Sequence, residues 1–307
     1  MTGPGMAGRR LIGQRGVALL MVIWMLALIS LLAVGMSATA STEGRLTHNL
    51  VEEARARYLA QAAVHHTVLQ LLDPAGPVDP VPDGSVVRVF EHRGATLTVR
   101  LRDECGKLDI NTGWGRMLLG LMIAHGAGER GFAMSQAILD WRDPDDRRRV
   151  DGAEDNEYAA DGLAYGARDG LFEAIDELQQ VRGMTAELYR RLAPDVTVDC
   201  LNAGINALAA SPYALASIPD LDRAVIERFL EARRDAVRSG GASGIPDLID
   251  GGKYVETSSG RVYEIIAEAE LASGRRVAWQ AVVWLTYDAT RPFLFRVWRR
   301  APVSDAP

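Results

Sequence analysis

The chain has 307 residues, 48% of them hydrophobic, which is enough for one or two domains with a real core. Its formal net charge of −6 argues against a nucleic-acid-binding protein, because such proteins present a basic face to the phosphates. Its two cysteines, Cys105 and Cys200, are able to pair in an oxidising compartment, and two buried free thiols are the alternative.

Residues 17–36 form an almost wholly apolar run without a charge. About 20 residues in a helix are long enough to cross the ~30 Å hydrocarbon layer of a bilayer. Arg9, Arg10 and Arg15 precede the run, and basic residues on a short N-terminal side hold that end in the cytoplasm. The run therefore predicts a membrane anchor with the rest of the chain outside the cytoplasm. Three interpretations of the run compete. It is a plain membrane anchor, an anchor that follows a processed leader, or a cleaved secretory signal, for which residues 38–40 offer a small-residue cleavage pattern.

Gly16 lies between the basic leader and the apolar helix, directly before Val17. This arrangement resembles the class III leader of pilins and pseudopilins. The resemblance implies that a prepilin peptidase removes residues 1–16 and that Val17 becomes a methylated N-terminus. Most members of that family carry glutamate at the fifth mature position, where this chain has Met21. In the family that carboxylate pairs with the N-terminal amine of a neighbouring subunit, so its absence resembles the K subunits of type II secretion, the large minor pseudopilins at the tip.

One helix is expected to cover residues 17–72. After the membrane run, apolar residues recur at a three-to-four spacing and charged residues take much of the other side. Asp73 and Pro74 end this helix. Residues 73–103 then begin an α/β domain with a loop and a β-hairpin that turns at Gly94.

Three further strands are predicted over residues 262–271, 276–287 and 293–298. Residues 261–301 are therefore expected to complete the sheet, before a tail of residues 302–307. The predicted fold class is α+β. A pilin-like membrane-spanning helix packs on an antiparallel sheet, and a large all-α domain is inserted between the strands.

That inserted domain, residues 104–260, is helical in pattern and contains a weak repeat. A polar segment with Asp and Asn precedes a predicted helix at residues 117–125, and a similar segment precedes one at residues 205–210. Such side chains cap free N–H groups at helix starts. Second helices are expected at residues 135–142 and 223–238.

A third unit, residues 174–192, is typical of two short helices joined by a glycine turn. Gly183 would supply the left-handed turn residue, and Thr185 would cap the second helix. Helix-turn-helix units of this size resemble the SAM-like and helix-hairpin-helix group.

Four motifs of the insert resemble the protein K family of type II secretion in order and spacing. They are DECGKLDINT from residue 103, ILDWRDPDD from residue 138, GAEDNEYAADG from residue 152, and ELQQVRGMTAELYRRLAPDVTV from residue 177. With the leader, the resemblance extends over most of the chain. Cys105 is a departure, because a polar residue is expected there.

Eight carboxylates crowd residues 143–161. Close carboxylates repel one another unless a cation lies between them, and calcium prefers several oxygen ligands in a flexible geometry. A solvated acidic loop, balanced by three neighbouring arginines, is the alternative. The family resemblance implies calcium in the helical domain, and the predicted ligands are Asp151, Glu154 and Asp155.

The sequence contains no nucleophile elbow, Walker loop or zinc-ligand pattern, so no catalytic residue and no enzyme are predicted. The resemblance implies a minor pseudopilin that forms the tip of the periplasmic pseudopilus and helps start its assembly for protein export. The implied partners are minor pseudopilins I and J, the prepilin peptidase and the inner-membrane secretion platform, and not nucleic acid. The implied location is the bacterial inner membrane, crossed once, with the C-terminal domain in the periplasm. The alternatives are a membrane-anchored helix-hairpin-helix nucleic-acid-binding protein and an exported metal-dependent hydrolase.

Overall fold

A computed structural model of the chain describes residues 15–73, 83–239, 249–256, 261–286 and 288–303. Most of the predicted leader, most of the loop after residue 73, Tyr287 and most of the predicted tail lie outside the described residues. The chain divides into two compact units, Met1–Arg55 and Ala56–Pro307.

Helix α1 (Arg15–Leu72) is one helix of 58 residues. Among the described residues, its stretch Val17–Val34 is the segment long and apolar enough to cross a membrane, and none of that stretch is buried. The helix ends at Leu72, because Pro74 follows and the residue before a proline disfavours the helical conformation. The predicted N-terminal apolar helix is confirmed.

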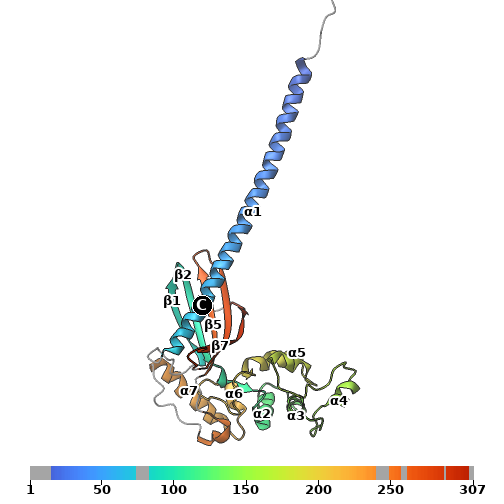
Figure 1. Ribbon diagram of the computed structural model, residues 1–307, viewed down its shortest axis with the longest axis vertical. Helices are drawn as coiled ribbons and strands as arrows, with labels where there is room; N and C mark the ends of the chain where they lie inside the picture. Colours follow the sequence, from blue (N-terminus) through green and yellow to red (C-terminus); the bar gives the residue numbers. More distant parts are fainter. Residues whose placement is uncertain (1–14, 74–82, 240–248, 257–260, 287, 304–307) are drawn as a thin grey trace, which may run out of the picture. The chain divides into compact units, whose positions relative to one another are not determined.

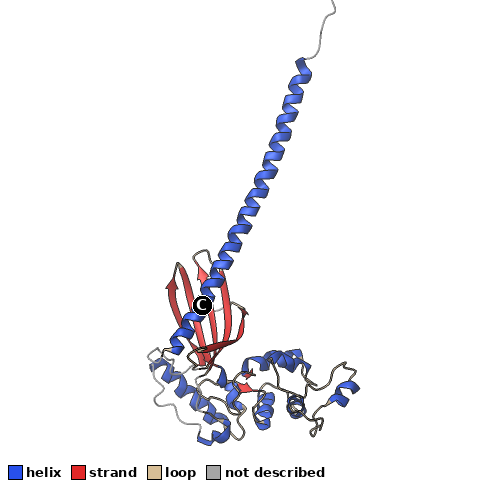
Figure 2. Cartoon of the chain, viewed as in Figure 1, coloured by secondary structure: helices blue, strands red, loops and turns tan. Residues whose placement is uncertain are grey.

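The second unit contains a five-stranded antiparallel sheet, which confirms the predicted sheet (Figure 2). The strand order is β1-β2-β5-β6-β7. The strands are β1 (Asp83–His92), β2 (Ala95–Asp103), β5 (Val262–Leu271), β6 (Arg276–Leu285) and β7 (Phe293–Ala301). Arg93 and Gly94 turn the first hairpin with φ of 51° and 73°, the left-handed conformation that a two-residue hairpin turn requires.

The central strand β5 joins the two halves of the sheet. Its Ala267 lies opposite Val99 of β2 and Trp279 of β6. Because β2 and β5 are neighbours in space and far apart in sequence, the chain leaves the sheet after Asp103 and returns to it at Val262.

The last turns of α1 cross one face of this sheet (Figure 1). Small side chains on the helix, at Ala56, Ala60 and Ala63, are at most 1% exposed, so the helix lies close to the strands. Alternate residues of β2, such as Leu97 and Val99, point into the same core, which is the period-two pattern of a strand with one buried face.

The chain between β2 and β5 forms helices that lie beyond the end of the sheet where β2 finishes (Figure 1). The α-helices are α2 (Gly115–Ala124), α3 (Arg130–Arg142), α4 (Asp155–Ala160), α5 (Ala186–Leu192), α6 (Pro212–Ala216) and α7 (Arg223–Ser239). The 3-10 helices are η1 (Glu104–Gly106), η2 (Ile175–Gln180), η3 (Ala193–Asp195) and η4 (Ile249–Tyr254). Two short parallel strands, β3 (Leu108–Asp109) and β4 (Val196–Thr197), pair where the chain leaves the sheet and enters this helical region. These helices enclose a core of their own, separate from the core under α1.

The predicted helix at residues 205–210 is wrong. Ile205 forms an isolated parallel bridge with Val255, and a turn follows. Asn206 uses its side chain locally, since its Oδ1 accepts from the Leu208 N–H at 3.1 Å. Bonds of this kind compete with a helix for the backbone donors.

In the third unit, the first predicted helix is the 3-10 helix η2, and the second is α5. Thr185 caps α5, because its Oγ1 accepts from the Leu188 N–H at 3.2 Å. Gly183 has φ of 84°, which is the left-handed conformation that the turn requires. The SAM-like or helix-hairpin-helix assignment of these units stays a prediction.

Candidate functional site: the neck and acidic loop of the helical insert

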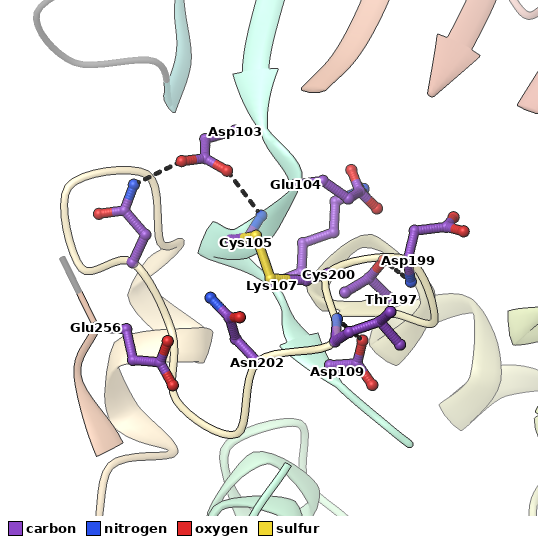
Figure 3. The surroundings of a disulfide bond; sticks show 12 residues. Asp103, Glu104, Cys105, Lys107, Asp109, Thr197, Asp199, Cys200, Asn202 and Glu256 are labelled. Atoms are coloured by element: carbon purple, nitrogen blue, oxygen red, sulfur yellow. Dashed lines mark hydrogen bonds and ion pairs between the residues drawn. A yellow bond between two sulfur atoms is a disulfide. The ribbon is translucent and has the colours of Figure 1, made fainter. Parts of the chain in front are cut away.

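The two ends of the segment between Cys105 and Cys200 meet in a short neck beside the sheet (Figure 3). Cys105 lies in η1, and Cys200 follows β4 by three residues. In the structure their sulfur atoms are bonded, with the two Cα atoms 5.2 Å apart. The parallel pair of β3 and β4 runs alongside, with Asp109 opposite Thr197. A loop with a sequence separation of 95 is thereby closed both covalently and by backbone pairing.

Buried polar side chains tie the two arms of the neck together. Asp103 accepts from the Cys105 N–H at 2.9 Å and from Nδ2 of Asn206 at 2.8 Å (Figure 3). Asp109 accepts from the N–H groups of Asn111 and Leu201, at 2.8 and 2.7 Å. The repeated polar segments predicted to cap following helices therefore bind each other, and the N-cap residue of α2, Trp114, makes no side-chain cap hydrogen bond.

Sequence reasoning missed a buried ion cluster where the neck meets the sheet. Nζ of Lys107 lies 2.9 Å from Oε1 of Glu104 and 3.5 Å from Oε2 of Glu264 on β5. Burial raises the pKa of Glu104, although Lys107 acts in the opposite direction. Burial also opposes the charge of Glu264, but Lys107, Gln280 and Arg102 together outweigh it and lower the pKa of that carboxyl. The signal that was available is that Lys107 is one of only two lysines in the sequence.

The acidic loop lies between α3 and α4 and gathers carboxylates from three segments. Asp140, at the end of α3, is fully buried and accepts from the N–H groups of Arg149 and Ala153. Glu154, directly before α4, is 5% exposed. Burial, followed by the neighbouring carboxylates of Asp140 and Asp143, raises the pKa of Glu154 to about 7.

Two carboxylate oxygens of this loop lack a hydrogen-bond partner among the described residues. They are Oε1 of Glu154 and Oδ1 of Asp143. A buried carboxylate oxygen without a donor is costly unless a cation supplies the missing charge, so this chemistry fits an oxygen-binding cation. Nevertheless, no three acidic, histidine or cysteine side chains of the described residues are already arranged to hold a metal ion.

The structure treats the three predicted calcium ligands differently. Glu154 and Asp155 belong to the converging carboxylates, since Asp155 helps to raise the pKa of Asp169, after burial and Asp146. The backbone of Gly166 lies against Asp155, because a Cβ at residue 166 would lie 1.7 Å from its Oδ1. Asp151 is exposed, with φ of 61°, and is not among the carboxylates that act most strongly on Glu154.

The predicted cleavage pair, Gly16 and Val17, lies in the first turn of α1. The side chain of Val17 is 55% exposed, as are its apolar neighbours along the helix to a similar degree. Their exposure fits a helix that needs an apolar surrounding.

The structure has the same fold as a solved protein complex component. A chain in the crystal structure of the GspK-GspI-GspJ complex from the enterotoxigenic Escherichia coli type 2 secretion system matches with a TM-score of 0.58 and 18% identity. The match covers 86% of this chain and 99% of that chain.

Sequence comparison points to the same family. Residues 109–199 match a family model described as "Type II secretion system (T2SS), protein K". The type II secretion system protein K of Pseudomonas aeruginosa is 25% identical over 86% of this chain and 87% of its own length. That of Klebsiella pneumoniae is 25% identical over 66% of this chain and 69% of its own length. In sequence and in fold, the chain is therefore similar to type II secretion system protein K.

The matched stretch of the protein K family model lies between the two cysteines of the neck. It includes the acidic loop, so both features described above belong to the part of the chain that carries the family pattern. The protein K assignment does not favour the nucleic-acid-binding alternative.

Proposed function

We propose that this chain is a minor pseudopilin that forms the tip of the periplasmic pseudopilus, helps start its assembly and acts with minor pseudopilins I and J. The observation that carries the proposal is the similarity of the chain to protein K, and the solved complex that contains the matching fold also contains GspI and GspJ. On this proposal the chain has a structural role and performs no catalysis.

Two features of the molecule support the proposed tip position. Met21 offers no carboxylate to the N-terminal amine of a subunit above it, and a buried amine needs such a partner. The helical insert between β2 and β5 also widens the subunit beyond a plain pilin-like helix and sheet. A wide subunit that cannot pair with a subunit above it ends a filament.

On this proposal a prepilin peptidase cuts between Gly16 and Val17, and the new N-terminus is methylated. The helix remains in the inner membrane, associated with the secretion platform, and the C-terminal domain lies in the periplasm. A bond between Cys105 and Cys200 supports that location, because disulfides persist in oxidising compartments and are rare in the cytosol.

The mass of the mature N-terminus tests this processing. We expect a chain that begins at Val17 and carries one methyl group. Gly16→Leu should leave the leader attached, whereas the matched control Gly13→Leu, also in the leader, should be cut normally. A Gly16→Leu chain that is still cut before Val17 contradicts the proposal.

Recovery of the partners tests the role. Minor pseudopilins I and J should co-purify with the full chain from detergent-solubilised membranes. Deletion of the chain should reduce pseudopilus formation, and labelled chain should lie at filament ends. Label spread along the filament would contradict a tip role.

We also propose that the acidic loop binds calcium. Glu154 and Asp155 remain the proposed ligands, and Asp143 and Asp169 take the place beside them that Asp151 was predicted to fill. Bound calcium would supply the positive charge that these carboxylates lack, and so hold the loop between α3 and α4 to the segment around Asp169.

A further inference from the structure

Strand β7 is an edge of the sheet whose outer side has no strand partner among the described residues. Such a strand presents a row of backbone N–H and C=O groups to any extended segment that approaches it. β7 has one irregularity, where Arg296 is an extra residue between the pairs Phe295–Val283 and Val297–Val282. Regular pairing with β6 resumes from Val297 to Ala301, so the outer backbone groups of this stretch are placed to pair with another strand.

The α1 side of this edge is aromatic. The ring of Trp298 lies 4.6 Å from that of Phe295, 5.7 Å from that of Trp279 and 5.1 Å from that of His65 on α1, measured between centroids. Trp298 is nevertheless 36% exposed. A side chain on the same face of an added strand would cover it.

The face of β7 opposite α1 carries charged side chains and borders a cavity. Nε of Arg299 donates to Oε1 of Gln280, but the described residues give its two Nη atoms no ion-pair or hydrogen-bond partner. A cavity of about 220 Å³ lies here, lined by Arg296, Arg299, Asp176 and Asp199 among others. Asp199 already pairs with Arg296 at 2.9 Å, so Arg299 is the cation that remains available to a ligand.

We infer that the β7 edge from Val297 to Arg300 binds an extended segment of one of the two minor pseudopilins, in which apolar residues alternate with acidic ones. The inference rests on the proposed function. Backbone pairing supplies the contact, and alternate side chains supply specificity, because successive residues of the added strand fall on opposite faces. One face meets Trp298, and the other places a carboxylate against the Nη atoms of Arg299, which suit a paired hydrogen bond to a carboxylate.

Charge argues against a second copy of this chain as the occupant. Self-pairing would bring two sets of three arginines, at residues 296, 299 and 300, together along one short edge. Like charges that face each other across paired strands are destabilising. The opposite edge of the sheet, β1, exposes Val87 and Val89 and has no comparable aromatic cluster, so it serves as the control surface.

Site-specific photocrosslinking in the full chain tests the inference, with the chain co-expressed with minor pseudopilins I and J. A photoreactive phenylalanine at Trp298 should crosslink to one of the two, and the same residue at Val89 should not. Arg299→Glu should lower recovery of that partner about tenfold, as the loss of an interface arginine does. The control Arg291→Glu changes an exposed arginine before β7 and should recover the partner normally.

The outcomes separate the inference from the proposed function. Melting of each variant by circular dichroism verifies that it is folded. If the unsubstituted chain recovers neither pseudopilin, the proposed function is wrong and the inference falls with it. If it recovers them and folded Arg299→Glu does so equally well, or if Trp298 crosslinks only to a second copy, the inference alone is wrong.

Discussion

Nε2 of His125 lies 3.0 Å from Oδ2 of Asp195 in the interior of the helical insert. Both side chains are buried, and the imidazole stacks on Tyr213 with 4.4 Å between the ring centroids. His125 ends α2 and Asp195 ends η3, so the pair joins two segments that are 70 residues apart. Burial alone would raise the pKa of Asp195, but the hydrogen bonds from His125 and Ser211, together with the charges of His125 and Arg102, outweigh it and lower that pKa.

Asp195→Ala should therefore destabilise the insert. Removing one partner of a buried pair leaves the other without its bond, and we expect a loss of about 3 kcal/mol in unfolding free energy at pH 7. Urea unfolding followed by tryptophan fluorescence measures it. Asp220→Asn is the control, because Asp220 is exposed where it pairs with Arg116 and asparagine tolerates the φ of 63° at this residue, so the change should cost under about 1 kcal/mol. Equal losses in the two variants would contradict the role of the buried pair.

The same pair predicts a pH dependence. A carboxyl whose pKa is lower in the folded than in the unfolded chain stabilises the fold above its unfolded value, and this contribution is lost as the pH falls through the folded value. The difference in unfolding free energy between the wild type and Asp195→Asn should be constant near neutral pH and should shrink below about pH 4. Unfolding titrations from neutral to acidic pH are the measurement, and an advantage that grows with acid would reverse the sign.

Glu154 should respond to pH in the opposite direction. Since its pKa is raised to about 7, by burial first and neighbouring carboxylates second, the folded chain holds a proton that the unfolded chain releases. In a chelator, stability should therefore fall as the pH rises from the ordinary value of 4.5 to about 7. Added calcium should restore it at pH 8. Glu154→Gln should raise the melting temperature in chelator and abolish the response to calcium.

The control for that experiment is Asp151→Asn, which changes an exposed carboxylate outside the group that acts most strongly on Glu154. Asparagine tolerates the positive φ of residue 151, so the fold should be unaffected. A calcium response that survives in Glu154→Gln and disappears in Asp151→Asn would restore the ligand assignment made from the sequence.

Breaking the disulfide should loosen the neck. The loop that it closes has a sequence separation of 95, and loss of such a crosslink costs about 2–5 kcal/mol. A reductant should lower the unfolding midpoint of the wild type and leave that of the Cys105→Ser/Cys200→Ser variant unchanged. Two free thiols titrated in oxidised, unfolded protein would show that the bond is absent.

Lys107→Met should lower the unfolding free energy far more than the same change at Lys253, the other lysine of the chain. It leaves Glu104 and Glu264 buried beside each other without their cation, at a cost of about 3–5 kcal/mol. Lys253→Met is the matched control, since Nζ of Lys253 lies over the exposed ring of Trp114 and should contribute under about 1 kcal/mol. Denaturant midpoints compare the two, and a tolerant Lys107→Met would mean that the two glutamates take up protons at little cost.

The features that local chemistry determines were predictable from the sequence. Gly94 indicated the first hairpin turn, and Thr185 indicated the start of α5, because each acts within a few residues of itself. The helix predicted at residues 205–210 is wrong because the prediction did not account for Asn206. The side chain of Asn206 forms hydrogen bonds with the Leu208 N–H and with Asp103 instead.

The candidate site was harder to predict, because it depends on residues that are distant in sequence. The acidic pattern predicts Asp151 as a ligand, but it gives no indication that Asp140 and Asp169, from other segments, help to raise the pKa of Glu154. The rarity of lysine distinguishes Lys107, but it gives no indication of the partner Glu264, which follows more than 150 residues later, on β5. The sequence also left the state of the cysteines open between a bond and two buried thiols.

The neck makes the loop from Cys105 to Cys200 a self-contained attachment. The two ends of this loop lie side by side. Its residues can therefore be lengthened, shortened or replaced in evolution while the strand pairing of the sheet keeps its register. An appendage grafted from one relative should accordingly be accepted on the stem of another.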